Sequence, residues 1–175
     1  PVWKPSYRIA IADSGKVNDI RKYGIEDGQV IALVDRETPS RGKEMTFLQQ
    51  LFAAHPPDAE VIVAYQGGEP TLMGLEFYAR SVELAARYAG PHQSVLHTIQ
   101  TNGTLLDDEW GAFLAEYGFL VGLSIDGPRP MHDAYRVDKG GKPTFDRVVR
   151  GLDVLKRHGV EWNALTTVNA ANGDH

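Results

Sequence analysis

The sequence has no cysteine among its 175 residues, and this absence excludes several kinds of chemistry at once. Without a thiol the chain forms no disulfide, offers no thiolate nucleophile and supplies no thiolate ligand to a metal. Histidine does not replace cysteine as a ligand set, because the scattered histidines show no HExxH spacing; they include His92, His97, His158 and His175. We therefore predict no metal site in this chain.

Long hydrophobic runs and an excess of basic residues are also missing. No apolar run approaches the roughly 20 residues that a membrane helix needs. The first residues, PVWKPSYR, lack the charged start and the apolar stretch of a signal peptide. The 18 Lys and Arg are outnumbered by 23 Asp and Glu, so the net charge is −5 and no basic stripe is present for nucleic acid. We expect a monomeric cytoplasmic protein that binds neither membranes nor nucleic acids.

From residue 60 onward, short apolar runs alternate with amphipathic stretches. Strands are predicted at 60–65, 94–100, 119–125 and 161–168, and helices between them at 74–90, 107–118 and 145–159. Thr144 stands where it can cap the last helix. The alternation indicates an α/β fold with a parallel sheet, either a closed or partly closed barrel or an open doubly wound sheet. Because the chain ends seven residues after the last predicted strand, we interpret it as part of a larger domain.

Residues 1–56 follow a different pattern. Strands are predicted at 7–13 and 29–35, and a short helix within 44–55. The sequence HPPD at 55–58 is a natural boundary. We therefore divide the chain into a divergent N-terminal segment, 1–56, and a core, 57–175.

The first polar signature follows directly on the predicted strand at 60–65. It reads Gln66-Gly67-Gly68-Glu69. Glycine lets the backbone approach a ligand closely, and the carboxylate of Glu69 is an acceptor for an ammonium group. A plain strand-to-helix turn explains the same glycines, so both interpretations stay open for this segment alone.

The second polar signature follows the predicted strand at 94–100. Gln100 and Thr101 stand where a barrel aims side chains at a substrate. Asn102-Gly103 favours a turn with positive φ. This signature therefore combines a turn with two candidate pocket residues.

The third polar signature runs from Ser124 to Arg136. These two residues offer a hydroxyl and a planar guanidinium, which together suit the grip of a carboxylate. A surface salt bridge is the alternative for Arg136. His132 and Asp133, between them, are interpreted as a hydrogen-bonded pair with a structural role.

Three segments resemble, in order and spacing, the core of the anaerobic sulfatase-maturating enzymes: VAYQGGEPTLMGLEFY, HTIQTNGTLLDDEW and FLVGLSIDGPRPMHDAYRVDKGGKPTFDRVVRGLDVLKRHGVEWNALTTVNAAN. These enzymes belong to the radical S-adenosylmethionine (SAM) superfamily, in the branch with a C-terminal SPASM region. The resemblance is nearly continuous from Glu60 to His175. It implies a partial (β/α)6 TIM-like barrel, of which this chain holds about the first half to two thirds.

The resemblance also implies a reaction. Members of the family reduce SAM with a [4Fe-4S] cluster and form a 5′-deoxyadenosyl radical, which abstracts hydrogen from a Cys or Ser of a sulfatase and leads to Cα-formylglycine. The expected partner is a sulfatase polypeptide or a similar peptide. The family's catalytic acid/base carboxylate lies outside this chain, so the catalytic residue is unknown here.

Transferred to this sequence, the resemblance implies a SAM site. Gly67, Gly68 and Glu69 are expected to meet the amino end of SAM, and Ser124 and Arg136 are expected to hold its carboxylate. Four residues are expected in the pocket near SAM or the substrate peptide: Gln66, Gln100, Thr101 and Asn102. The residue chemistry agrees, because an ammonium acceptor and a carboxylate clamp suit an amino-acid headgroup.

The cluster motif of the family is missing. Lys4-Pro5 is present, but no CxxxCxxC follows it, so this Cys-free chain cannot hold the [4Fe-4S] cluster through thiolates. Three interpretations stay open: a radical SAM maturase that is inactive as given, a SAM- or peptide-binding module without radical chemistry, and a frameshifted or chimaeric sequence that has replaced the cluster loop.

Overall fold

The structure is a computed structural model that describes residues 6–11, 17–26, 29–34 and 47–169, with side-chain surroundings from residue 47 onward. Lys4 and Pro5 lie outside the described residues. The chain divides into two compact units, Pro1–Thr98 and Ile99–His175. The boundary at residue 56 divides the chain by sequence resemblance rather than by compactness, and it stays a prediction.

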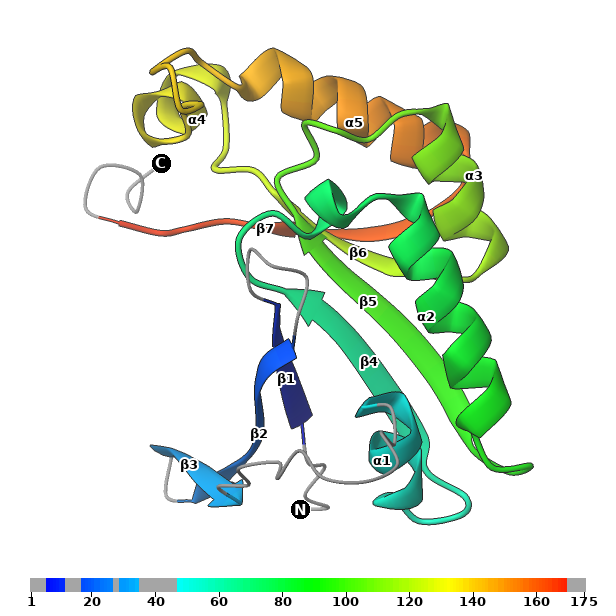
Figure 1. The fold of residues 1–175 in the computed structure, drawn as a ribbon. Helices are drawn as coiled ribbons and strands as arrows, with labels where there is room; N and C mark the ends of the chain where they lie inside the picture. Colours follow the sequence, from blue (N-terminus) through cyan, green and yellow to red (C-terminus); the bar gives the residue numbers. More distant parts are fainter. Residues whose placement is uncertain (1–5, 12–16, 27–28, 35–46, 170–175) are drawn as a thin grey trace. The chain divides into compact units, whose positions relative to one another are not determined.

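The first unit holds, within the described residues, four strands, three helical segments and the start of a fifth strand. In chain order they are β1 (Ser6–Ile11), β2 (Val17–Glu26), β3 (Gln29–Val34), α1 (Phe47–Ala53), β4 (Glu60–Gln66), the 3₁₀ helix η1 (Pro70–Met73), α2 (Leu75–Tyr88) and β5 (Ser94–Thr101). The strand order is β3-β2-β1-β4-β5 (Figure 1). Strand β1 is antiparallel to β2 and parallel to β4, with Ile9 beside Tyr65.

The predicted strands at 7–13 and 29–35 and the predicted helix within 44–55 are confirmed as β1, β3 and α1. Strand β2, which pairs with both β1 and β3, was not predicted. Its sequence VNDIRKYGIE places two polar pairs, Asn18-Asp19 and Arg21-Lys22, among the apolar residues, so the alternation typical of a half-buried strand is weak.

The core of the first unit lies between β4 and α2. The predicted strand at 60–65 and helix at 74–90 are confirmed, and β4 buries Val61, Val63 and Tyr65 because its β-branched and aromatic residues suit a covered sheet. Helix α2 buries Tyr78 and Ser81 on its inner face. The hydroxyls of Tyr65 and Ser81 lie 2.6 Å apart, so the polar ends of this core are hydrogen-bonded.

The second unit continues from the end of β5. It contains α3 (Asp108–Glu116), β6 (Leu120–Ser124), α4 (Arg129–Tyr135), α5 (Phe145–Arg157) and β7 (Glu161–Leu165), with the strand order β5-β6-β7. Strands β6 and β7 are parallel, and Ser124 pairs with Leu165. The predicted strands at 94–100, 119–125 and 161–168 and the helices at 107–118 and 145–159 are confirmed. Helix α4 was not predicted; it begins with Pro128 at the N-cap and Pro130 in its first turn, where proline is tolerated.

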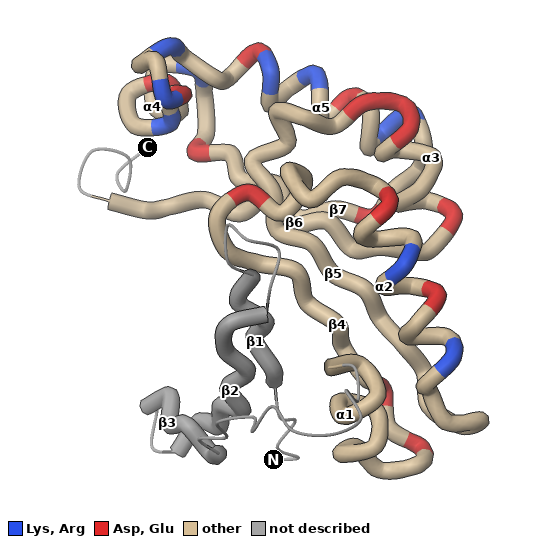
Figure 2. The backbone as a smooth tube through the Cα atoms, in the orientation of Figure 1, with Lys and Arg blue, Asp and Glu red and all other residues tan. Residues whose placement is uncertain are grey.

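Helices α3 and α5 pack against each other within the second unit. Gly111 of α3 allows this contact, since a Cβ there would lie 2.8 Å from the side chain of Val154 on α5. Leu114 and Leu155, one from each helix, are completely buried. Figure 2 shows charged residues along the helices, whereas β5 and β6 carry none. The two strands therefore contribute no charged side chain to this unit.

The start of α5 differs from the sequence prediction. Thr144 occupies the N-cap position, but its side chain does not cap the helix, so the predicted cap is wrong. Oδ1 of Asp133 accepts hydrogen bonds from the backbone N–H groups of Thr144 (3.1 Å) and Phe145 (2.9 Å) instead. The capping acceptor thus comes from α4, eleven residues earlier in the chain than Thr144.

The α/β class predicted from the sequence is confirmed by these elements and by the parallel β1–β4 and β6–β7 pairs. In the described part of the chain, none of the helices combines the length and apolar character that crossing a membrane requires.

Candidate functional site

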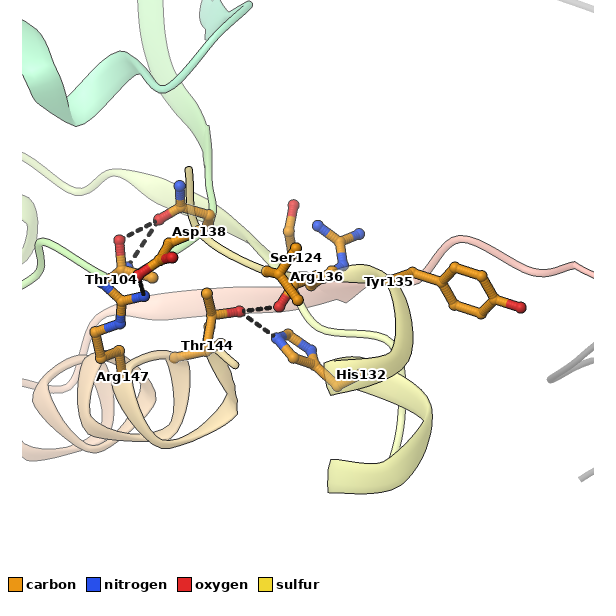
Figure 3. A pocket seen from close by; sticks show the side chains of 11 residues that line it. Thr104, Ser124, His132, Tyr135, Arg136, Asp138, Thr144 and Arg147 are labelled. Atoms are coloured by element: carbon orange, nitrogen blue, oxygen red, sulfur yellow. Dashed lines mark hydrogen bonds and ion pairs between the residues drawn. The ribbon is translucent and has the colours of Figure 1, made fainter. Parts of the chain in front are cut away.

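A cavity of about 330 Å³ lies in the second unit beyond the ends of β5 and β6 (Figure 3). Its wall comes from the turn after β5, the last residue of β6, α4 with the connection that follows, and the start of α5. The lining residues with polar side chains are Asn102, Thr104, Ser124, His132, Tyr135, Arg136, Asp138, Thr144 and Arg147. Volumes of about 300–1,000 Å³ are usual for small-molecule sites. The cavity therefore lies where the sequence predicted function, at the carboxyl ends of parallel strands.

Arg136 forms a two-point ion pair inside this region. Its Nε donates to Oδ2 of Asp126 at 2.5 Å, and its Nη2 donates to Oδ1 at 3.0 Å. The side chain of Asp126 is 6% exposed and that of Arg136 is 27% exposed. The salt bridge named as an alternative for Arg136 is therefore real, but its carboxylate is buried rather than at the surface.

Asp126 is charged although it is buried. Burial by itself would raise the pKa of its carboxyl group, but the hydrogen bonds from Arg136 and from the backbone N–H of Thr167 outweigh burial and hold the pKa below its usual range. The Thr167 N–H donates to Oδ1 of Asp126 at 2.8 Å. The carboxylate therefore stays ionised at neutral pH, with donors on both oxygens.

His132 is completely buried and connects Asp126 to the start of α5. Its Nδ1 lies 3.3 Å from the backbone N of Asp126, and its Nε2 lies 3.0 Å from the hydroxyl of Thr144. That hydroxyl donates its one proton to the backbone carbonyl of Arg136 (2.7 Å), so it must accept from Nε2–H. His132 is thus the neutral tautomer with the proton on Nε2, and its pKa is lowered first by burial and then by the nearby Arg136.

The predicted hydrogen bond between His132 and Asp133 is not formed. Although they are neighbours in sequence, His132 bonds Asp126 and Thr144, whereas Asp133 caps α5. The prediction of a structural role holds for both residues, but the proposed pairing is wrong.

A second ion pair lines the cavity, between Asp138 and Arg147 (2.8 Å). Asp138 also accepts hydrogen bonds from the backbone N–H groups of Gly140 and Lys142, both at 2.9 Å, and so holds the turn at 138–142. Sequence reasoning missed this pair. The aspartate two residues before Gly140 is a pattern of side-chain-stabilised turns, and it indicates the turn but not the ion pair with Arg147.

The Asn102-Gly103 turn predicted after β5 is confirmed. Gly103 has a φ of 72°, and the Asn102 carboxamide oxygen accepts from the N–H and the hydroxyl of Thr104 at 2.9 and 2.8 Å. Thr101 is buried, and its hydroxyl accepts from the N–H of Gly103 at 3.0 Å. Gln100 is exposed. Of these predicted pocket residues, Asn102 lines the cavity, whereas Gln100 and Thr101 do not.

The remaining predicted residues lie in the first unit. Gln66 is the last residue of β4, and the exposed Gly67 and Gly68 follow with φ values of 103° and 52°. A Cβ at either glycine would meet no atom within 4 Å, so backbone conformation rather than crowding requires glycine here. Oε1 of Glu69 accepts from the N–H and hydroxyl of Thr71 at 3.1 and 2.6 Å, and Glu69 thereby caps η1.

No cluster of three or more His, Cys, Asp or Glu suited to a metal ion occurs among the residues that the structure describes. The complete sequence adds no cysteine to this set. A thiolate-held iron–sulfur cluster therefore does not fit the donors of this chain.

Comparison with known proteins shows which family the chain resembles in sequence. The family model of the radical SAM superfamily matches residues 18–174. The chain is 47% identical over 116 residues to a serine-type anaerobic sulfatase-maturating enzyme of Bacteroides thetaiotaomicron, which covers 66% of this chain and 28% of the enzyme. It is 41% identical over 112 residues to a cysteine-type anaerobic sulfatase-maturating enzyme of Clostridium novyi, which covers 64% of this chain and 30% of that enzyme.

Solved structures give the same relationship. The structure described as native anSMEcpe with bound AdoMet and Kp18Cys peptide matches with a TM-score of 0.70 and 38% identity, over 73% of this chain and 35% of that one. The form described as having bound AdoMet alone matches with a TM-score of 0.69, also at 38% identity and the same coverage. The chain thus spans about a third of the length of these relatives.

Proposed function

The chain belongs to the radical SAM superfamily, and from this premise we propose that it binds SAM, with the amino-acid headgroup of SAM held at Ser124 and Arg136. The observation that supports this proposal is which nitrogens of the Arg136 guanidinium already have hydrogen-bond partners. Asp126 occupies its Nε and Nη2 edge, while Nη1 donates to no partner among the described residues. A carboxylate that approaches Nη1 and the Ser124 hydroxyl gains charge-assisted hydrogen bonds without breaking the ion pair.

By the family resemblance, we assign Gly67, Gly68 and Glu69 to the amino end of SAM. Support comes from the open space beside both glycines and from the carboxylate of Glu69, whose Oε1 already caps η1. We assign Gln66, Gln100, Thr101 and Asn102 to the surroundings of SAM or of a bound peptide. These assignments rest on the family resemblance and on the chemistry of each residue.

The activity that the similarity favours is the maturation of sulfatases, in which a Cys or Ser becomes Cα-formylglycine. The [4Fe-4S] cluster that cleaves SAM in this superfamily does not fit this Cys-free chain, so we derive no radical step for it. We propose instead that the chain keeps the binding functions, for SAM and for a sulfatase polypeptide or similar peptide. In this proposal 1–56 stand in place of the cluster-binding region, 57–175 form part of the SPASM-branch core, and the protein is a cytoplasmic monomer.

Calorimetric titration with SAM tests the headgroup assignment. Arg136→Ala is expected to weaken SAM binding by about 10- to 100-fold, because it removes charge-assisted hydrogen bonds to a carboxylate. The matched control is Arg157→Ala, which removes an exposed arginine that pairs with Asp108 at the surface. 5′-Methylthioadenosine, which has the nucleoside but no amino acid, is expected to bind wild type and Arg136→Ala alike.

Two results would contradict this proposal. Absence of SAM binding to the wild-type chain would refute SAM as the ligand. Equal loss of SAM and 5′-methylthioadenosine binding in Arg136→Ala would show that the substitution damages the fold rather than the headgroup contact. Anaerobic treatment with iron and sulfide tests the cluster separately. The chain is expected to gain no iron–sulfur absorbance, and a stable cluster would refute the conclusion that this chain does not hold one.

A further inference from the structure

Asp126 is the first charged residue after β6, and its carboxylate accepts three hydrogen bonds. Its carboxylate accepts Nε and Nη2 of Arg136 and the backbone N–H of Thr167. We infer that Asp126 is a positioning residue that holds the Arg136 guanidinium ready for the carboxylate of an amino-acid ligand. This inference rests on the proposed function.

The hydrogen bonds around Asp126 close into a ring. The Asp126 N–H donates to Nδ1 of His132, and Nε2–H of His132 donates to the Thr144 hydroxyl. That hydroxyl donates to the backbone carbonyl of Arg136, and the Arg136 guanidinium returns to the Asp126 carboxylate. Both ends of the Arg136 residue, its carbonyl and its guanidinium, are therefore fixed by one connected network. Figure 3 shows the part of it in which the Thr144 hydroxyl joins His132 to Arg136.

The ring is anchored in the sheet of the second unit. Ile125, next to Asp126, donates its N–H to the carbonyl of Leu165 at 3.1 Å, and the Thr166 hydroxyl donates to the carbonyl of Ile125 at 2.7 Å. Thr167, just beyond β7, donates to the Asp126 carboxylate. The ends of two paired strands thus set the position of Asp126, and Asp126 in turn sets that of the guanidinium.

A fixed guanidinium matters because arginine has many rotamers. An arginine that must be ordered when its ligand arrives loses side-chain entropy at that moment, and affinity falls accordingly. The ring removes this cost beforehand by holding the planar fork in one orientation. Nη1, which no described residue holds, is then the group presented to the ligand.

A test of this role has to separate the effect of the negative charge of Asp126 from the effect of the position of its carboxylate. Asp126→Asn disturbs the fork, but it also removes a negative charge that repels a ligand carboxylate, and the two effects on affinity have opposite signs. Asp126→Glu keeps the charge and moves the carboxylate by one methylene. It therefore shifts the carboxylate without removing its charge, and it is the informative substitution.

The experiment is calorimetric titration of the full chain with SAM, for Asp126→Glu in two backgrounds. In the wild-type background, Asp126→Glu is expected to weaken SAM binding by about tenfold. In the Arg136→Ala background it is expected to cause no further loss, because Asp126 acts through Arg136. The control is Asp108→Glu, which changes an exposed carboxylate paired with Arg157 and is expected to leave SAM affinity unchanged.

A second pair of variants tests the ring if Asp126→Glu fails to fold. Thr144→Val removes the hydroxyl that joins His132 to the Arg136 carbonyl and is expected to weaken SAM binding, whereas Thr144→Ser keeps the hydroxyl and is expected to preserve it.

The outcomes distinguish this inference from the proposed function. If the wild-type chain binds SAM and Asp126→Glu binds it equally well, the positioning role is wrong while SAM binding stands. An equal loss in the wild-type and Arg136→Ala backgrounds also overturns the role, since it shows a general effect on the fold. If the wild-type chain does not bind SAM, the proposed function and this inference fail together.

Discussion

Gly151 of α5 provides a sharp test of the packing that shapes the cavity. It is buried against the Asn102-Gly103 turn, and a Cβ at residue 151 would lie 3.1 Å from the carbonyl carbon of Gly103 and 3.4 Å from its Cα. The obstacle is backbone, which cannot rotate away as a side chain can. Movement of the turn is limited further, because the inner side of Gly103 faces Leu123.

Two effects of Gly151→Ala oppose each other. Alanine raises helix propensity and by itself would stabilise the chain by about 1 kcal/mol. Overpacking against a fixed neighbour costs about 1–3 kcal/mol, and a backbone obstacle favours the upper end of that range. We therefore expect a net loss of about 2 kcal/mol in the free energy of unfolding.

Urea unfolding monitored by tryptophan fluorescence measures this balance, since Trp110 of α3 is buried in the same unit. Gly111→Ala is the comparison, because the added Cβ there would meet the side chains of His158 and Val154 rather than backbone. We expect it to cost less than Gly151→Ala. Stabilisation by Gly151→Ala, as helix propensity alone predicts, would refute the close approach of α5 to the turn.

Two further predictions concern capping and acid stability. Asp133→Ala removes the acceptor at the start of α5 and is expected to lower the free energy of unfolding by about 1 kcal/mol. The control Asp153→Ala, on the exposed side of α5, is expected to change it little. Equal losses in the two variants would contradict the capping role of Asp133. Burial lowers the pKa of His97 from 6.5 to about 4, so the unfolded chain binds more protons between these values. Stability is therefore expected to fall by up to about 3 kcal/mol as pH drops through this window, and His97→Asn should remove most of that slope; an unchanged slope would assign it to other groups.

The secondary structure was predictable where local pattern decides it. Apolar runs and amphipathic periodicity placed β4 to β7 and the helices α2, α3 and α5, because burial on one face imposes a period on the sequence. The Asn102-Gly103 turn followed from the tolerance of these residues for positive φ. Strand β2 and helix α4 were missed, since β2 lacks a clear apolar alternation and α4 is only seven residues long.

The sequence predicted several residues of the candidate site, but not the partners with which the site residues form ion pairs and hydrogen bonds. Ser124, Arg136 and Asn102 do line one cavity, as the strand-end argument predicted for residues of a shared sheet edge. Asp138 and Arg147 were missed, because nothing in the local sequence shows that the turn at 138–142 folds back onto α5. The cap of α5 was assigned to Thr144 for the same reason, since Asp133 reaches it only through the packing of α4 on α5.

The sequence by itself determined what this chain cannot ligate and which chemical groups it offers. The absence of cysteine excludes a thiolate-held cluster in any conformation, because no fold can supply a missing ligand. Only the tertiary structure decided how Arg136 is used. Its partner Asp126 precedes α4, whereas Arg136 follows it, and Asp126 is fixed by the ends of β6 and β7. Which nitrogens of the guanidinium are occupied is therefore a property of the packed unit rather than of the local sequence.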